Sequence, residues 1–304
     1  MTLEQLRIFV AVAERQHVTQ AAQALHLTQS AVSAAVAAIE SRYGVTLFDR
    51  VGRGIRLTET GRRFLSEARA VLARASEAET VLFDLSALKI GSLALSASQT
   101  VGNYWLPPLL QRFRAGNAGI ALSLTLGNTE SVREAVHEGR IDLGFIEGPI
   151  DDPLLSVTAI ADDEMVMVAK PGLLAARRRL TAADLGRIAW VLREHGSATR
   201  VILEDALSKA GVPLAALEIA LELPSNEAVR AAVEAGAGAT ILSRHAVDGS
   251  LRSGVLERLP FVLPKRHFYV LRHKQRYVSA AAEAFLALIR DKRPFKRPAS
   301  PASA

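Results

Sequence analysis

The sequence predicts an α/β protein made of a small helical unit, one long helix and a large domain of strands and helices. Three observations lead to this prediction. Residues 1–58 contain short stretches with helical apolar spacing, residues 59–89 repeat apolar positions every three or four residues, and residues 90–290 alternate strand-like with helical runs. Such alternation indicates sheets, expected to be parallel, that are covered by helices.

The composition indicates a folded protein without disulfides. The chain has 304 residues, enough for two or three domains, with 49% hydrophobic residues and no cysteine. The start lacks the basic stretch and apolar run of a signal peptide, and no apolar run approaches the roughly 18 residues of a membrane span. We therefore expect a cytoplasmic protein with no membrane partner, no metal site and no cofactor.

The net charge of +6 is concentrated at the two ends of the chain. Residues 1–90 hold 11 Lys/Arg against 9 Asp/Glu, and residues 285–304 hold 5 against 1. A basic end is compatible with nucleic acid, but a charge run is usually a solvated surface. We expect residues 291–304, rich in Lys, Arg, Pro, Ser and Ala, to form a disordered basic tail.

The first 58 residues predict three helices followed by a hairpin. Thr2 and Gln5 fit a capping box at the start of the first helix, and Thr19 is a plausible N-cap for the second. A three-residue turn then leads to a third helix, which is a helix-turn-helix pattern. After that helix, "VTLFDRVGRGIRLT" predicts a basic hairpin that turns around glycines and carries Arg50, Arg53 and Arg56.

The third helix has an unusual polar face. Its apolar positions recur at helical spacing, while the opposite face holds small uncharged residues, namely Gln29, Ser30, Ser33, Ala34 and Ala37. A face turned to water usually carries Lys and Glu. A smooth uncharged face suits close approach to base edges in the DNA major groove; the alternative is a helix buried on both sides.

Residues 59–89 predict a long helix whose apolar stripe lasts about three heptads. The stripe consists of Phe64, Ala68, Val71, Ala75, Ala78, Leu82 and Leu85. Such a stripe favours pairing with a second copy of the helix; the alternative is an ordinary core helix.

The large domain predicts two lobes. The chain is expected to cross over near Ile160 and return near His267, so that lobe I spans about 90–160 and 267–290 and lobe II about 161–266. Ligands in open α/β sheets bind beyond the carboxyl ends of strands, where helices begin. Clusters of hydroxyl, amide and charged side chains occur at these positions: Ser98, Thr100, Asn128, Thr129, Glu147, His195, Ser197, Thr199, Arg200 and Asn226. Each cluster alone could be helix capping, but several in a two-lobed fold favour a cleft for an anion. Glu147 tempers this preference, since a carboxylate would select against dianions.

The stretch "AAQALHLTQSAVSAAVAAIESRYGVTLFDRVGRGIRLTETG" resembles the winged helix-turn-helix of the LysR-type transcriptional regulators, and the resemblance extends over the whole chain. It includes the Ala-Ala pair, the Thr-Gln-x-Ala-Val-Ser run and the Leu-Phe-x-Arg start of the wing. Two positions depart from the family pattern: Ser30, where members often have Pro, and Ala34, where they have a polar or basic residue. "QSAVSAA" and "LREHGSATR" are most similar to the branch linked to sulfur-oxyanion metabolism, with carbon-fixation regulators as a related branch.

The resemblance implies a function for each part. Gln29, Ser30 and Ser33 would read base edges, Thr28 at the helix N-terminus would hold a phosphate, and Arg50, Arg53 and Arg56 would contact the DNA backbone or minor groove. The large domain would resemble type 2 periplasmic binding proteins and bind a small effector, with sulfite as the first candidate. Residues 59–89 would join two chains, the two-lobed domains would join two dimers, and the assembly would contact RNA polymerase at a promoter.

Other classes are less well supported. The sequence has no Gly-x-Ser-x-Gly elbow, P-loop or HExxH motif, so we do not expect an enzyme. A solute-binding protein would share the two-lobed fold, but the helix-turn-helix and the lack of a signal peptide argue against it. An architectural DNA-binding protein without an effector is a weaker alternative.

Overall fold

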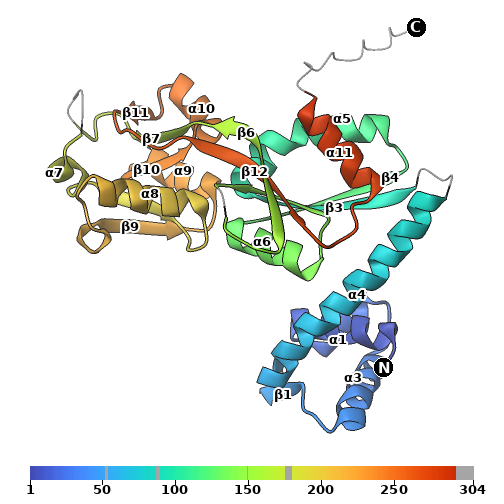
Figure 1. Ribbon diagram of the computed structural model, residues 1–304. Helices are drawn as coiled ribbons and strands as arrows, with labels where there is room; N and C mark the ends of the chain where they lie inside the picture. The colour runs from blue at the N-terminus through green and yellow to red at the C-terminus, as the bar shows by residue number, and fades with distance from the viewer. Residues whose placement is uncertain (52–53, 87–89, 149, 175–179, 292–304) are drawn as a thin grey trace, which may run out of the picture.

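The computed structural model describes residues 1–51, 54–86, 90–148, 150–174 and 180–291 (Figure 1). The predicted tail therefore lies, apart from Asp291, outside the described residues, and so does Arg53 of the predicted wing. Figure 1 shows the long helix α4 joining the N-terminal unit to the two-lobed domain.

The N-terminal unit contains the three helices and the hairpin that were predicted. Its elements are α1 (Leu3–Arg15), α2 (Val18–Ala24), α3 (Gln29–Tyr43), β1 (Phe48–Val51) and β2 (Gly54–Leu57). The capping box of Thr2 and Gln5 is present. Phe9 lies fully buried in the centre, with its ring 5.5 Å from that of Phe48 and 4.7 Å from that of Phe64.

The predicted N-cap of the second helix is wrong. The helix begins at Val18, and His17, in extended conformation, caps it through a ring nitrogen that accepts from the N–H of Gln20. Thr19 instead lies inside the helix, where its hydroxyl donates to Oε1 of Gln29 at 3.3 Å. Thr19 thereby connects the two helices of the helix-turn-helix.

The long helix α4 (Glu59–Leu85) belongs to two environments. Its first half is part of the N-terminal core, because Phe64, Leu65, Ala68 and Leu72 pack with residues of α1. Gly61 permits this approach, since a Cβ there would lie 2.2 Å from the carbonyl oxygen of Leu47. The predicted apolar stripe is thus covered by α1 near its start and exposed farther along the helix.

The two-lobed domain contains two five-stranded sheets. Lobe I has the strand order β4-β3-β5-β12-β6 and lobe II the order β11-β7-β10-β8-β9. The strands are β3 (Gly91–Ser98), β4 (Ile120–Gly127), β5 (Leu143–Glu147), β6 (Leu155–Asp163), β7 (Met165–Ala169), β8 (Ala189–Arg193), β9 (Glu218–Leu223), β10 (Ala239–Ser243), β11 (Glu257–Leu259) and β12 (Arg266–His273).

Helices cover both sheets and bury two main cores. The helices are α5 (Leu106–Gly116), α6 (Thr129–Glu138), α7 (Ala182–Leu185), α8 (Ala198–Lys209), α9 (Asn226–Ala235), α10 (Arg244–Arg252) and α11 (Ala280–Arg290). Two short helical turns accompany them, the π-helical turn η1 (Val101–Trp105) and the 3₁₀ turn η2 (Leu214–Ala216). The lobe I core is built around Phe145, Phe268 and Phe285, and the lobe II core around Trp190.

The sheets are mixed rather than parallel throughout, which corrects the predicted sheet type. Strands β3, β4 and β5 pair in parallel, but β12 pairs antiparallel with β5 and β6. In lobe II, β7 likewise pairs antiparallel with β10 and β11. The antiparallel strands are those at which the chain changes lobe. The crossings lie at Glu164 and just before Arg266, close to the predicted positions.

Candidate nucleic-acid interface and effector cleft

The third helix of the N-terminal unit presents the polar face that its sequence predicts. Val32 and Ile39 are buried, whereas Gln29, Ser30 and Ser33 are exposed. The hydroxyl of Thr28 accepts from the N–H of Ala31 at 3.2 Å and fixes the start of the helix. The other N–H groups of the first turn have no carbonyl partner within the helix, so they can bind an anion such as a phosphate.

The hairpin places its two described arginines on opposite faces. Arg50 lies opposite Ile55, which packs on the helices, whereas Arg56 lies opposite Asp49. Because side chains alternate along a strand, Arg50 and Arg56 point to different sides of the wing, and both are exposed. Arg50 and Arg56 could therefore contact a nucleic-acid backbone from two different directions.

Glu40 holds the hairpin against the third helix, a role that sequence reasoning missed. Its Oε1 accepts from the backbone N–H of Leu47 at 2.7 Å and from that of Phe48 at 3.3 Å. In the sequence, Glu40 stands out only as the single charged residue at the end of the uncharged helix face, and this does not indicate its contact with the hairpin. The contact fixes the wing relative to the exposed face of α3.

The polar clusters predicted in the two lobes meet at the junction between them. Nδ2 of Asn226 donates to the hydroxyl of Thr100 at 3.1 Å, and Nδ2 of Asn128 donates to the carbonyl of His195 at 3.4 Å. Gln99 strengthens the junction, because its amide donates to the carbonyl of Pro224 at 2.8 Å and accepts from the N–H of Asn226 at 3.0 Å. These contacts join the segment after β3 to the start of α9, and the start of α6 to the segment after β8.

Two hydroxyls at this junction stand out. Among the described residues, the buried oxygens of Ser98 and Thr129 have no hydrogen-bond partner. Ser98 ends β3, Thr129 begins α6, and the buried Glu147 ends β5, the strand that pairs with β3. A buried hydroxyl without a hydrogen-bond partner is costly in a folded protein, so both hydroxyls would gain from a partner that the described chain does not supply.

Other predicted residues are engaged by the protein itself. The hydroxyl of Thr199 accepts from Arg266 at 3.2 Å. Arg200 donates to Glu204, to Glu222 and to the carbonyl of Arg193, so its charge is balanced within lobe II. Ser197 is buried, and His195 is exposed. The cationic part of the predicted anion site is therefore weaker than its sequence implies.

Two further groups near the junction were not predicted: Arg193, whose partners lie within lobe II, and Tyr104, whose partner lies across the lobes. Arg193 is buried and donates to Oδ1 of Asn226 and to Glu194. Tyr104 donates its phenol to Glu227 at 2.7 Å, and burial together with this hydrogen bond raises the pKa of Tyr104 far above that of a free phenol. Tyr104 thus remains a proton donor across the physiological range. Neither residue lies in a local sequence pattern that indicates its role.

A buried ion pair lies where the chain crosses between the lobes. Nε of Arg266 donates to Oδ2 of Asp163 at 2.7 Å, and the hydroxyl of Ser243 donates to Oδ1 at 2.6 Å. The side chains of Arg266 and Asp163 are 1% and 0% exposed. This pair fixes the start of β12 to the end of β6.

Metal-binding clusters and membrane spans are absent from the described residues. That part of the chain holds no group of three or more His, Cys, Asp or Glu side chains placed to bind a metal ion. No helix in the described ranges combines the length and the apolar content required to cross a bilayer.

Two protein families match different parts of the chain. The family described as "LysR substrate binding domain" matches residues 86–294, and that described as "Bacterial regulatory helix-turn-helix protein, lysR family" matches residues 3–62. These matches cover the two-lobed domain and the N-terminal unit.

Two curated relatives extend over nearly the whole chain. The uncharacterized HTH-type transcriptional regulator YeiE of Escherichia coli K12 is 37% identical over 288 residues, which cover 94% of this chain and 96% of the relative. The RuBisCO operon transcriptional regulator of Allochromatium vinosum is 34% identical over 288 residues, covering 94% of each chain.

Solved structures have the same architecture. A full-length OxyR variant from Pseudomonas aeruginosa is 25% identical, with a TM-score of 0.69 and 95% coverage of both chains. The regulatory domain of CcmR from Synechocystis PCC6803, in complex with 2-PG, is 28% identical, with a TM-score of 0.60; the match covers 66% of this chain and 95% of that domain.

Proposed function

The chain belongs to the LysR family of transcriptional regulators, and on this premise we propose that it binds promoter DNA as a dimer and responds to a small oxyanion held between its lobes. The observation that carries the DNA-binding part is the exposed, uncharged face of α3 beside the Thr28 cap. Selection of binding sites from random duplex DNA tests it.

The proposed reading of DNA follows from the exposed groups. Gln29, Ser30 and Ser33 would contact base edges in the major groove, while Thr28 and the N–H groups at the start of the helix would hold a phosphate. Arg50 and Arg56 would contact backbone from the two sides of the wing, and Arg53 is proposed for the same role from its sequence position alone. Base contacts would set the sequence preference and phosphate contacts the register.

The proposed effector is a compact anion. Ser98, Thr129 and the start of α6 offer hydrogen-bond donors and little apolar area, which does not suit an aromatic ligand. Thr100 and Thr199 accept hydrogen bonds but keep their own protons to donate. Ser197, Asn128, Asn226, His195 and Arg200 would complete the lining, and Glu147 would accept a proton carried by the ligand.

Sulfite remains the first candidate effector, on the resemblance to the sulfur-oxyanion branch. The alternative is a regulator of carbon fixation, and two observations favour it: the identity to a RuBisCO operon regulator and the likeness to a regulatory domain in complex with 2-PG. Calorimetry with sulfite, sulfate, phosphate, 2-PG and small carboxylates distinguishes the two. Binding of sulfite alone supports the first, and binding of 2-PG alone supports the second.

Ser98→Ala and Thr129→Val are each expected to weaken binding of the anion identified in that panel. Each change removes a donor to a charged ligand, a loss of about 1.5–3 kcal/mol or roughly 10- to 150-fold in Kd. Ser96→Ala is the matched control, since the Ser96 hydroxyl is already bonded to the carbonyl of Thr125. An unchanged Kd in both variants would place the ligand elsewhere.

Leu82→Glu is expected to weaken self-association. Leu82 and Leu85 are 69% and 80% exposed on α4, and a second copy would bury them. Sedimentation measures the dimer dissociation constant, with Ser66→Glu, on a different face of α4, as the control. Equal dissociation constants for the two variants would show that this stripe is not the dimer seam.

Further steps of the proposal follow from the dimer. We expect two dimers to join through their two-lobed domains, and the DNA-bound assembly to contact RNA polymerase. The effector must bind the two states of the lobes with different affinity to shift them.

A further inference from the structure

One arginine of the long helix contacts both neighbouring domains. Nη2 of Arg69 lies 2.9 Å from Oε1 of Glu14 in α1, and Nη1 lies 2.7 Å from Oε1 of Glu138 in α6. A planar guanidinium with several donors is suited to hold two carboxylates in fixed directions. The Arg69 and Glu138 side chains are only 18% and 23% exposed, so solvent screens this pair less than a surface pair.

The two ion pairs of Arg69 differ in what they connect. Glu14 and Arg69 lie on helices that share the N-terminal core around Phe9 and Ala68. This pair therefore lies within one packed unit. Glu138 belongs to lobe I, so the pair between Arg69 and Glu138 crosses from the N-terminal unit to the two-lobed domain.

Helix α6 extends from this bridge to the interlobe junction. It begins at Thr129, next to the Asn128 side chain that donates to lobe II, and it ends at Glu138. Ten helical residues span about 15 Å as a rigid rod. A displacement of its first turn by the lobes must therefore move its last turn, where Glu138 lies.

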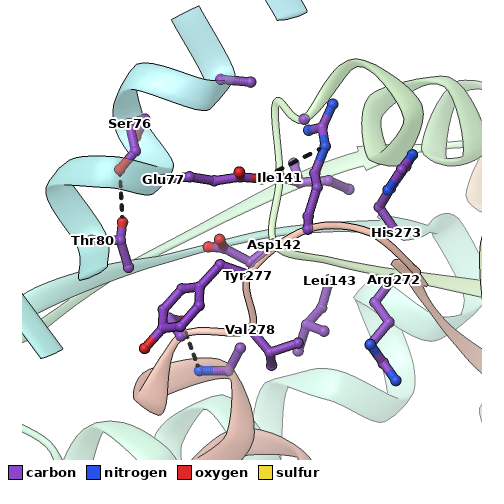
Figure 2. A pocket seen from close by; sticks show the side chains of 15 residues that line it. Ser76, Glu77, Thr80, Ile141, Asp142, Leu143, Arg272, His273, Tyr277 and Val278 are labelled. Atoms are coloured by element: carbon purple, nitrogen blue, oxygen red, sulfur yellow. Dashed lines mark hydrogen bonds and ion pairs between the residues drawn. The ribbon is translucent and has the colours of Figure 1, made fainter.

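The last turn of α6 is seated closely on the long helix. Gly139 has φ of +69°, and a Cβ there would lie 2.7 Å from Cβ of Ala73 in α4. Arg276 donates to the carbonyl of His137 at 2.8 Å, and its Nε lies 3.7 Å from Oε1 of Glu77. Figure 2 shows Glu77 extending from α4 into this junction, toward the lobe I segment that carries Ile141 and Asp142. Because α6 packs this closely on α4, the two helices have little freedom to move independently.

We propose that Arg69 is a positioning residue that fixes the orientation of the helix-turn-helix unit on lobe I, and that α6 connects this bridge to the interlobe junction. The regulatory meaning of the connection rests on the proposed function. When the lobes move α6, the contact between Arg69 and Glu138 carries that movement to the N-terminal unit, because the contact to Glu14 is internal to that unit.

Distances between two spin labels test the proposal without DNA or effector. The chain has no cysteine, so Gln23→Cys in α2 and Glu134→Cys in α6, both exposed, give one labelled pair. Dilution with unlabelled chain leaves one labelled protomer per assembly. We expect a narrow distance distribution in the parent, and a broader distribution with a shifted mean in both Arg69→Gln and Glu138→Gln.

The matched control is Arg63→Gln in the same helix. Arg63 is exposed and pairs locally, with Glu59, so its distribution should equal that of the parent. Parental distributions in both Arg69→Gln and Glu138→Gln overturn the proposal, as does equal broadening in Arg63→Gln. Melting temperature, recorded for each variant, separates loss of orientation from loss of fold, and Glu138→Gln alone decides if Arg69→Gln does not fold. Because neither DNA nor anion is present, failure here is distinct from failure to bind a promoter.

Discussion

Ser33→Arg is expected to abolish sequence-specific DNA binding while the protein remains folded. Ser33 is exposed on α3, so a larger side chain there meets no core residue of the described chain. In the major groove, the arginine would hold the helix away from the base edges and leave only phosphate contacts. Affinity for the specific site should fall toward the non-specific level, a loss on the order of 10³-fold or more.

Footprinting and fluorescence anisotropy on the selected DNA site measure this loss. Ser66→Arg makes the same chemical change at an exposed serine of α4 and should retain the parental footprint. An unchanged footprint for Ser33→Arg would mean that α3 does not enter the groove.

Asp163→Ala is expected to give the largest loss of stability. The substitution leaves the buried guanidinium of Arg266 and the hydroxyl of Ser243 without their shared acceptor. Breaking a buried pair by removing one partner costs about 3–5 kcal/mol. The melting temperature of the full-length protein should fall accordingly, because this pair holds the crossing between the two lobes.

The neighbouring residue provides the control for that measurement. The Asp162 side chain is 92% exposed and pairs with His267 at the surface, so Asp162→Ala should change stability by no more than about 0.5 kcal/mol. Equal melting temperatures for the two variants would show that the buried pair contributes nothing to the native state.

Local patterns predicted the elements that bear on DNA recognition. Thr28 caps α3, and the spacing of Val32 and Ile39 gives its buried side, as the structure shows. Both features depend on residues close together in the chain, where helical geometry fixes the contacts. The predicted start of the second helix is wrong because His17 competes with Thr19 for the cap, and spacing alone does not distinguish them.

Long-range pairing could not be predicted from one sequence. Arg266 and Asp163 lie 103 residues apart, and Arg69 and Glu138 lie 69 apart, so no period connects them. Strand direction could not be predicted for the same reason. The alternation of strands and helices indicated parallel strands, but it carries no signal that β12 returns to lobe I and pairs antiparallel with β5. For Arg200, the spacing in the sequence shows only Glu204, one turn along α8; the second partner, Glu222, lies on another element, so the sequence alone leaves part of the guanidinium available to an anion.

The most direct test of the account is selection of binding sites by the purified full-length protein from a library of random duplex DNA. We expect enrichment of an interrupted palindrome, because two copies of α3 related by a dimer axis would read two equivalent half-sites about one helical turn or a multiple of it apart. The Ser33→Arg variant, run beside it, should enrich no sequence. Failure of the parent protein to enrich any sequence, or enrichment of the same palindrome by Ser33→Arg, would contradict the assignment of α3 as the element that reads DNA.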